Sequence, residues 1–352
     1  MHPENKTLVI LTPGFPESEA DTTCLPMQQS FVRALQENNP QLKIIILSFQ
    51  YPYKIKTYKW YDATVMSFAG KNKGGLSRLL LRRKLYATLN NINSKNKIAG
   101  ILSFWVGECA WVGKKFADKN NLKHFCWILG QDAKKGNKYI KTTKLAAGEL
   151  IALSDFLQDE FEKNYGTRPQ CVIAPGINPK QFSHPIKEKN IDIIAAGSLI
   201  PLKQFEIFIQ IIFEIKKQLP AVKAMLVGTG PQKEKLQSLI LKYGLQENMM
   251  LTGELPYNKV LELMQRTKVF LHPSSYEGFS GVCQEGIAAG THVISFCKPM
   301  KADIKHWHVV ANKNEMKNLA LEILQNPNTD FENIIPFSMK DTAKKMMELF
   351  KV

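Results

Sequence analysis

The chain of 352 residues is 44% hydrophobic and 22% charged, which excludes a disordered protein and leaves room for two domains of ordinary size. Its net charge of +16 is uneven, because residues 1–185 carry 26 basic and 14 acidic side chains and residues 186–352 carry 21 and 17. No apolar run approaches the ~18 residues of a transmembrane helix, and the short apolar stretch before Pro13 predicts a buried strand and not a signal peptide.

The first half alternates short apolar runs with amphipathic stretches, a pattern typical of α/β folds with parallel sheets. Strands are predicted at 8–11, 44–49, 100–104, 124–129 and 150–153. Helices are predicted at 27–37, 76–91, 108–119 and 156–164.

Two loops of this half are candidates for a binding site, because each follows a predicted strand. One holds Gly14 and Phe15, where a glycine allows close approach of the backbone to a ligand. The other holds Gly130 and Asp132, ahead of several lysines. Ligands of doubly wound sheets bind beyond the carboxyl ends of the strands. A plain surface turn is the alternative for the first loop.

The basic segment 54–84 has nine Lys and Arg residues and one acid, Asp62. In its last part, 71–85, leucines fall on one side of a predicted helix and cations on the other, as in helices that lie on anionic lipid. The alternative is a domain helix with a solvated basic face. No aromatic and basic platform or known motif supports nucleic-acid binding.

Proline, glycine, asparagine and lysine replace the apolar runs between residues 175 and 190, as expected of a linker. We therefore expect an N-terminal domain at 1–185, a C-terminal domain at 186–336 and a terminal helix at 337–352. In the second half, strands are predicted at 191–196, 224–227, 249–251, 269–271 and 293–296. Helices are predicted at 205–218, 232–243, 257–265 and 314–325.

Glycine turns follow three of these strands. Gly197 and Ser198 precede Lys203, which could reach a phosphate as a point charge or could simply be a surface lysine at a helix start. Gly228 lies in a Val-Gly-Thr-Gly-Pro turn, which alone is weak information. Glu254 and Leu255 end the third strand, and their backbone groups could read the edge of a base.

Glu277 and Glu285 lie eight residues apart in the run from His272 to Gly290. The first is predicted on a loop and the second about one turn into a helix at 281–289. The backbone N–H groups at such a helix start attract anions, phosphate above all. Two carboxylates that accept hydroxyl hydrogen bonds beside an anion site would suit a sugar nucleotide. Complementing the helix dipole is the alternative role.

This run, with its loop glycine and small helix end, resembles the E-x7-E signature of retaining GT-B glycosyltransferases of family four. The resemblance is strong over 191–296 and weaker in the first half. It implies two Rossmann-like doubly wound domains that face each other across a cleft, with the terminal helix crossing back onto the N-terminal domain. The activity implied is transfer of a hexosyl group from a nucleotide sugar, with retention and without a metal.

The resemblance also assigns roles to residues. Glu285 would hold the ribose hydroxyls, Glu277 the sugar hydroxyls, and Lys203 the leaving diphosphate, with Asp132 as a further catalytic residue. Ser198 and Leu129 replace the Arg and His that the family usually carries. The other residues expected at the donor are Gly197, Ser198, Gly228, Glu254, Leu255, Gly278, Phe279, Ser280 and Gly281, and those expected in the cleft of the N-terminal domain are Gly14, Phe15 and Gly130.

The expected acceptor is a cell-envelope glycan or its lipid-linked precursor, and the basic N-terminal half could touch an anionic membrane. No D-x-D is present, and His306 and His308 lack further ligands nearby, so neither a metal nor a cofactor is expected. Six cysteines without a C-x-x-C pair favour a reducing cytoplasm. A sugar-nucleotide epimerase and a non-catalytic GT-B subunit stay open as alternatives.

Overall fold

The computed structural model describes residues 6–182, 186 and 188–351, and the chain divides into two compact units. The first unit comprises Met1–Gly176 together with Met339–Val352, and the second comprises Ile177–Ser338. The structural boundary thus lies after Gly176, whereas the sequence pattern placed it after residue 185. Part of the expected linker, 183–185 and 187, lies outside the described residues.

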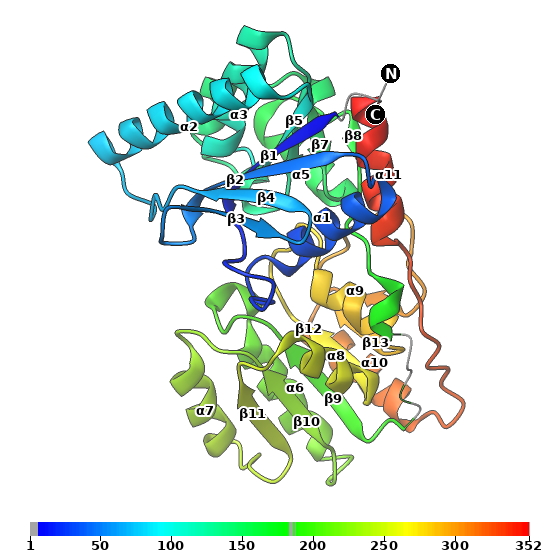
Figure 1. Cartoon of the computed structure of the whole chain (residues 1–352). Helices are drawn as coiled ribbons and strands as arrows, with labels where there is room; N and C mark the ends of the chain where they lie inside the picture. Colours follow the sequence, from blue (N-terminus) through cyan, green and yellow to red (C-terminus); the bar gives the residue numbers. More distant parts are fainter. Residues whose placement is uncertain (1–5, 183–185, 187, 352) are drawn as a thin grey trace. The chain divides into compact units, whose positions relative to one another are not determined.

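The first unit contains an eight-stranded sheet in the order β3-β4-β2-β1-β5-β6-β7-β8, in which β3 and β4 pair antiparallel and the other neighbours pair parallel (Figure 1). The strands are β1 (Thr7–Gly14), β2 (Lys43–Tyr51), β3 (Lys56–Trp60), β4 (Ala63–Ser67), β5 (Ile98–Phe104), β6 (His124–Ile128), β7 (Leu150–Ala152) and β8 (Cys171–Val172). The helices are α1 (Pro26–Asn38), α2 (Gly75–Lys95), α3 (Glu108–Asn120), α4 (Tyr139–Thr143), α5 (Asp155–Tyr165) and α11 (Met339–Phe350), with short 3-10 turns at Gln131–Ala133 and Ala147–Glu149.

Helices cover both faces of this sheet. Val9 and Leu11 of β1 share a core with α2 and α3, while Phe31 of α1 packs against the rings of Phe104 and Trp127. A parallel strand that is covered on both faces consists of consecutive apolar residues, which is why β1 could be predicted from the sequence.

Strands β3, β4 and β8 were not predicted. Strand β3 lies at the edge of the sheet, and only its last residue is buried. It therefore has no apolar run, and in the sequence it forms part of the basic segment 54–84. The amphipathic pattern predicted at 71–85 is only partly correct. Leu81 and Leu85 of α2 lie in the core, whereas Leu76, Leu79 and Leu80 are exposed.

The second unit has a six-stranded, fully parallel sheet in the order β11-β10-β9-β12-β13-β14. Its strands are β9 (Ile191–Ala196), β10 (Ala224–Val227), β11 (Met249–Gly253), β12 (Thr267–His272), β13 (His292–Ser295) and β14 (Trp307–Val309). Its helices are α6 (Phe205–Lys216), α7 (Lys233–Lys242), α8 (Tyr257–Gln265), α9 (Gly281–Ala288) and α10 (Lys313–Gln325), with 3-10 turns at Pro179–Phe182 and Pro201–Lys203.

This sheet too is covered on both faces. Helices α6, α7 and α10 share a core with alternate residues of β9, β10 and β12, and α9 lies on the opposite face, where Gly286 approaches Phe270 and Val293. The unpredicted strand β14 has three residues and a buried Trp307, too short a segment for a periodic signal. The α/β class and the two Rossmann-like units are confirmed.

The terminal helix α11 belongs to the first unit. Phe350 packs its ring against Phe125, with centroids 5.0 Å apart, and Thr342 donates to the carbonyl oxygen of Ala174 at 2.9 Å. Among the residues that the structure describes, no helix combines the length and apolar character needed to cross a bilayer.

Candidate functional site

The loops after β9 and β12 flank the point at which the strand order of the second unit reverses. From β9 the chain continues to β10 and β11 on one side, and it then returns to build β12 and β13 on the other. Consecutive connections therefore leave the carboxyl ends of β9 and β12 in opposite directions, and such a switch point is where sheets of this kind bind ligands. Gly197 and Lys203 follow β9, and Glu277 follows β12.

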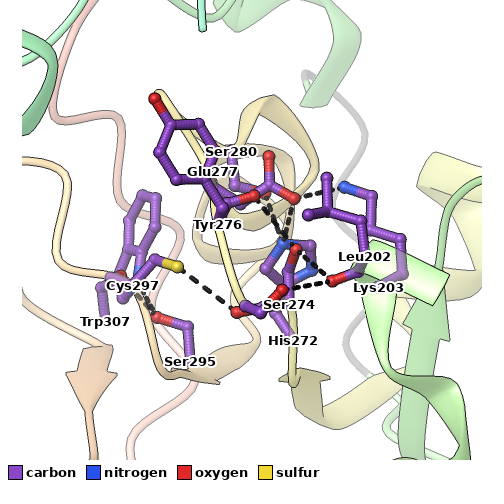
Figure 2. A network of polar contacts seen from close by, with 11 residues as sticks. Leu202, Lys203, His272, Ser274, Tyr276, Glu277, Ser280, Ser295, Cys297 and Trp307 are labelled. Atoms are coloured by element: carbon purple, nitrogen blue, oxygen red, sulfur yellow. Dashed lines mark hydrogen bonds and ion pairs between the residues drawn. The ribbon is translucent and has the colours of Figure 1, made fainter. Parts of the chain in front are cut away.

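A polar network joins these two loops (Figure 2). Lys203 Nζ donates to Glu277 Oε1, and His272 Nε2 lies 3.1 Å from the same oxygen. Ser280 Oγ lies 3.2 Å from His272 Nε2. Within the described part of the chain, the second carboxylate oxygen of Glu277 has no hydrogen-bond partner. One oxygen is thus held by the protein, and the other is available to a ligand.

Charges and burial in this network keep Glu277 ionised. Burial alone would raise the pKa of Glu277, but the hydrogen bond from His272 and the charge of Lys203 outweigh it and lower that pKa to about 2. Burial also lowers the pKa of His272, against the opposing effect of Glu277. The Nδ1 of His272 is buried without a partner among the described residues, so a proton there would be an unsatisfied donor. His272 is therefore neutral and carries its proton on Nε2, facing the carboxylate.

Backbone contacts fix the position of the Glu277 loop. The carbonyl oxygen of Leu202 accepts from Ser275 N at 3.0 Å and from Ser274 Oγ at 3.2 Å. On the other side, Cys297 Sγ, just after β13, donates to the carbonyl oxygen of Ser274 at 3.3 Å. The loops after three neighbouring strands are thereby tied together, as Figure 2 shows.

Glu285 lies about one turn into α9 and is held by Tyr257, the first residue of α8. The Tyr257 hydroxyl donates to Glu285 Oε1 at 2.8 Å. Burial raises the pKa of Glu285 to about 7, although the bond from Tyr257 opposes the shift. The two glutamates therefore differ: Glu277 is ionised throughout the neutral range, whereas Glu285 titrates within it.

The start of α9 presents backbone rather than side chains. Its cap residue, Ser280, makes no side-chain capping bond, and the first N–H groups of any helix lack acceptors within it. The side chain of Phe279 is buried against Trp307 and Phe337, so only the backbone of Phe279 could contact a ligand. A Cβ added to Gly281 would meet nothing within 4 Å, which leaves open space beside the helix N-terminus, while Gly278 is buried in the loop.

The glycine turns after β9 and β10 lie directly against each other. Gly197 and Gly228 have φ of 147° and 139°, values that favour glycine, and a Cβ on Gly228 would lie 2.0 Å from the Gly197 carbonyl oxygen. Ser198 is exposed on the first turn. At the end of β11, Glu254 is exposed and Leu255 is half-buried.

Two of the residues predicted at the site in the first unit, Asp132 and Phe15, have buried side chains. Asp132 is buried, and its carboxylate accepts from the backbone N–H groups of Val106, Leu129 and Gly130 at 2.9, 3.2 and 2.8 Å. Burial raises the pKa of Asp132 against these bonds, and the contacts of its carboxylate hold the loop in place.

Phe15 was predicted to line a cleft, but its side chain is fully buried against the ring of Trp60, 4.9 Å away between centroids. Gly14 ends β1, and Gly130 has a φ of 152° that favours glycine. These two glycines lie at the carboxyl edge of the first sheet, as their place after parallel strands requires.

Sequence reasoning missed several partners of these residues. His272 directly precedes Pro273 in the motif, but a histidine at the end of a buried strand gave no sign of its contact with Glu277. Tyr257 lies 28 positions before Glu285, and no local pattern links them. In the first unit, Glu108 accepts from Arg82 Nε at 2.8 Å, and no local pattern links these two residues either.

The two noted histidines, His306 and His308, meet a third, His292. Their ring centroids lie 4.2 and 5.4 Å from that of His292, and His292 Nδ1 lies 3.1 Å from His308 Nε2. Burial lowers the pKa of all three, that of His306 to about 4. Across 6–182, 186 and 188–351, no group of three or more His, Cys, Asp or Glu residues is arranged to hold a metal ion.

Comparison with known proteins places the chain in the GT-B class of folds. A crystal structure of Anabaena HepE in complex with UDP and glucose superposes with a TM-score of 0.71, over 99% of this chain and 100% of that one, at 16% identity.

The sequence profile of the family described as Glycosyl transferases group 1 matches residues 177–331, which lie within the second unit. Among curated relatives, the phosphatidylinositol N-acetylglucosaminyltransferase gpi3 subunit of Schizosaccharomyces pombe is 27% identical over 45% of this chain and 36% of its own length. The putative colanic acid biosynthesis glycosyltransferase WcaL of Escherichia coli is 24% identical over 53% and 49%. The chain thus spans half or less of the length of these two relatives.

Proposed function

We propose that the chain is a retaining glycosyltransferase that moves a sugar of the hexose type from a nucleotide sugar to a glycan or lipid-linked acceptor. The observation that carries the proposal is the pairing of Lys203 and Glu277 across the switch point of the second sheet, with one Glu277 oxygen left open. The names of two relatives also support the proposal, since one is named for colanic acid biosynthesis and one for transfer of N-acetylglucosamine.

The donor would occupy the crevice beyond β9 and β12. Its diphosphate would lie at the N-terminus of α9, whose N–H groups favour anions, with Lys203 balancing the charge that develops on the leaving group. The free oxygen of Glu277 would accept from sugar hydroxyls, and Glu285 would accept from the ribose. The turns at Gly197 and Gly228 would allow the nucleotide to approach the backbone.

The acceptor would be deprotonated by the leaving phosphate on the same face of the sugar, which gives retention. Backbone N–H groups and Lys203 would stabilise the leaving group, so the reaction requires no metal or other cofactor. With these proposed substrates, the chain would act on the cytoplasmic side, on a cell-envelope polysaccharide or its precursor.

A thermal-shift screen with UDP-, GDP- and ADP-sugars tests donor binding, because a ligand that binds the folded state raises its melting temperature. One class of donor should raise it at millimolar concentration, and Glu285→Ala should remove the rise. No rise with any donor would overturn the proposal, as would an unchanged rise in Glu285→Ala.

A non-catalytic subunit is the second candidate, favoured by Ser198, which is exposed and uncharged where the family usually has an Arg. A single hydroxyl replaces a bidentate cation there, which weakens the hold on a diphosphate. Incubation of a stabilising donor with candidate acceptors separates the two: a transferase forms glycosylated product, a subunit only binds, and an epimerase converts the donor without any acceptor.

A further inference from the structure

The N-terminal end of α2 extends beyond the core of the first unit. Residues 71–80 are all exposed, and the first buried side chain of the helix is Leu81. Leu76 is 81% exposed, Leu79 48% and Leu80 55%. Their spacing of three and four residues puts them on one face of the helix, so they form a single apolar surface that the fold leaves uncovered.

A second exposed apolar segment lies close to the loop that precedes α2. Tyr53 and Ile55, in the connection after β2, are 59% and 69% exposed. The loop before α2 is attached to the end of β2, since Lys71 N donates to the carbonyl oxygen of Gln50 at 3.2 Å and Lys71 Nζ lies 6.0 Å from the centre of the Tyr53 ring. We call the five side chains the apolar tip: Tyr53, Ile55, Leu76, Leu79 and Leu80.

Positive charge accompanies the apolar tip, and most of it is not paired with an acidic side chain. Between Ala63 and Gly107 the sequence has eight Lys and Arg residues and no Asp or Glu. Arg78 and Arg82 face Glu108, at 3.8 and 2.8 Å. The other exposed cations near the tip form no ion pair within the described part of the chain: Lys54, Lys71, Lys73, Arg83 and Lys84.

We propose that the apolar tip and its surrounding cations dock the chain on the surface of an anionic phospholipid bilayer. Leucines on a projecting helix end can enter the acyl boundary while lysines and arginines remain level with the phosphates. A nucleic acid would use the cations but leave the leucines exposed to water. The combination of both therefore selects lipid.

The docking surface also has a place in the proposed function, on which this step of the inference rests. Strands β2 and β4 run parallel, so the connection after β2 and the start of α2 lie at the carboxyl edge of the sheet. Glu108 begins α3 after β5, which pairs parallel with β1, so it lies at that same edge, and it is bonded to Arg82 of α2. A bilayer at the tip would present a lipid-linked acceptor to the edge of the sheet that ends in Gly14 and Glu108.

Vesicle flotation of the full chain tests the proposal without any sugar transfer, so docking and the proposed activity can fail separately. The chain should float with vesicles of phosphatidylcholine mixed with phosphatidylglycerol, and at least roughly ten-fold less with phosphatidylcholine alone. The variant Leu76→Ser/Leu79→Ser/Leu80→Ser should lose roughly ten-fold or more of this binding with an unchanged melting temperature. A variant with Lys71, Lys73, Arg83 and Lys84 changed to Gln should also lose binding.

The matched control is Leu241→Ser/Met250→Ser in the second unit, where both side chains are 57% exposed. It should bind vesicles as the unchanged chain does. Equal flotation of the leucine variant, or equal binding to both vesicle types, would overturn the proposal. Binding to RNA of the same strength, lost at moderate salt and insensitive to the leucines, would instead identify simple attraction to polyanions.

Discussion

The imidazole of His272 contacts the carboxylate of Glu277, with His272 Nε2 3.1 Å from Glu277 Oε1. Lys203 donates to the same oxygen, so two donors fix one side of the carboxylate and leave the other for a ligand. His272 is 1% exposed, which makes it a positioning residue that no substrate can touch.

Replacing His272 by Leu should therefore weaken transfer without removing any group that contacts the donor. Loss of a hydrogen bond to a charged group costs about 1.5–3 kcal/mol, or roughly 10- to 100-fold in kcat/KM. Affinity for the free nucleoside diphosphate should change little, because the effect acts through the sugar. Steady-state kinetics and calorimetry with the donor found by thermal shift measure the two quantities.

The variant His272→Gln provides the control, because its amide can donate near the position of Nε2. It should recover most of the lost activity. The acid limb of the pH profile gives a second readout: the pKa of Glu277 should rise in His272→Leu and return toward about 2 in His272→Gln. Equal activity and equal pH profiles in the two variants would mean that His272 only fills space.

Donor affinity should depend on pH through Glu285. Its pKa in the folded chain is raised to about 7, so it loses its proton only as the pH rises through that value. If the ionised carboxylate accepts the ribose hydroxyls, affinity for a nucleotide sugar should increase from pH 6 to pH 8 and level off above it. A nucleotide sugar suits this titration better than a nucleoside diphosphate, whose terminal phosphate also titrates near pH 6.

Glu285→Gln should make this affinity independent of pH, and Tyr257→Phe should move the transition to higher pH, since the hydroxyl of Tyr257 stabilises the ionised form. Isothermal calorimetry at several pH values measures both effects. A pH dependence that persists unchanged in Glu285→Gln would assign it to another group.

Much of the second unit could be predicted because its local signals agree. Strands β9, β10, β11 and β12 each contain an apolar run. The turns after β9, β10 and β12 carry the glycines, the prolines and the glutamate motif, which are local signals. The partners of the glutamates could not be predicted, because Lys203 and Glu277 are 74 residues apart and Tyr257 and Glu285 are 28 apart. Only the sheet order brings each pair together.

The first unit shows where local signals fail. Phe15 follows a strand, as a loop residue of a site would, yet it fills the core beside Trp60. Asp132 occupies a motif position but uses its carboxylate on backbone N–H groups. Sequence position alone does not distinguish a side chain that supports a loop from one that faces a ligand. The arrangement of the two domains across a cleft stays a prediction.

Gly228→Ala should destabilise the second unit strongly. The added methyl would lie 2.0 Å from the Gly197 carbonyl oxygen at a φ of 139°, where both atoms belong to rigid turns. We expect a loss of roughly 2–4 kcal/mol in the free energy of unfolding. Gly281→Ala is the matched control, because its methyl meets nothing within 4 Å.

Chemical denaturation should show Gly281→Ala within about 0.5 kcal/mol of the unchanged chain. Its methyl would nevertheless occupy the open space at the start of α9, so it should lower the thermal shift caused by a nucleotide sugar. Loss of stability in both variants, or in neither, would contradict the assignment of the first glycine to folding and the second to ligand access.

Phe350→Ala should destabilise the first unit, because the ring packs against the ring of Phe125 and against Gly100. The ring is so close to Gly100 that a Cβ added to this glycine would be 2.3 Å from it. Removal of a buried phenyl ring costs about 3–5 kcal/mol. Tryptophan fluorescence reports mainly on this unit, since Trp307 is the one tryptophan outside it. The exposed Met250 gives the control: Met250→Ala should leave the fluorescence transition within about 0.5 kcal/mol of its original position. An equally small effect of Phe350→Ala would mean that α11 contributes little to the core of the first unit.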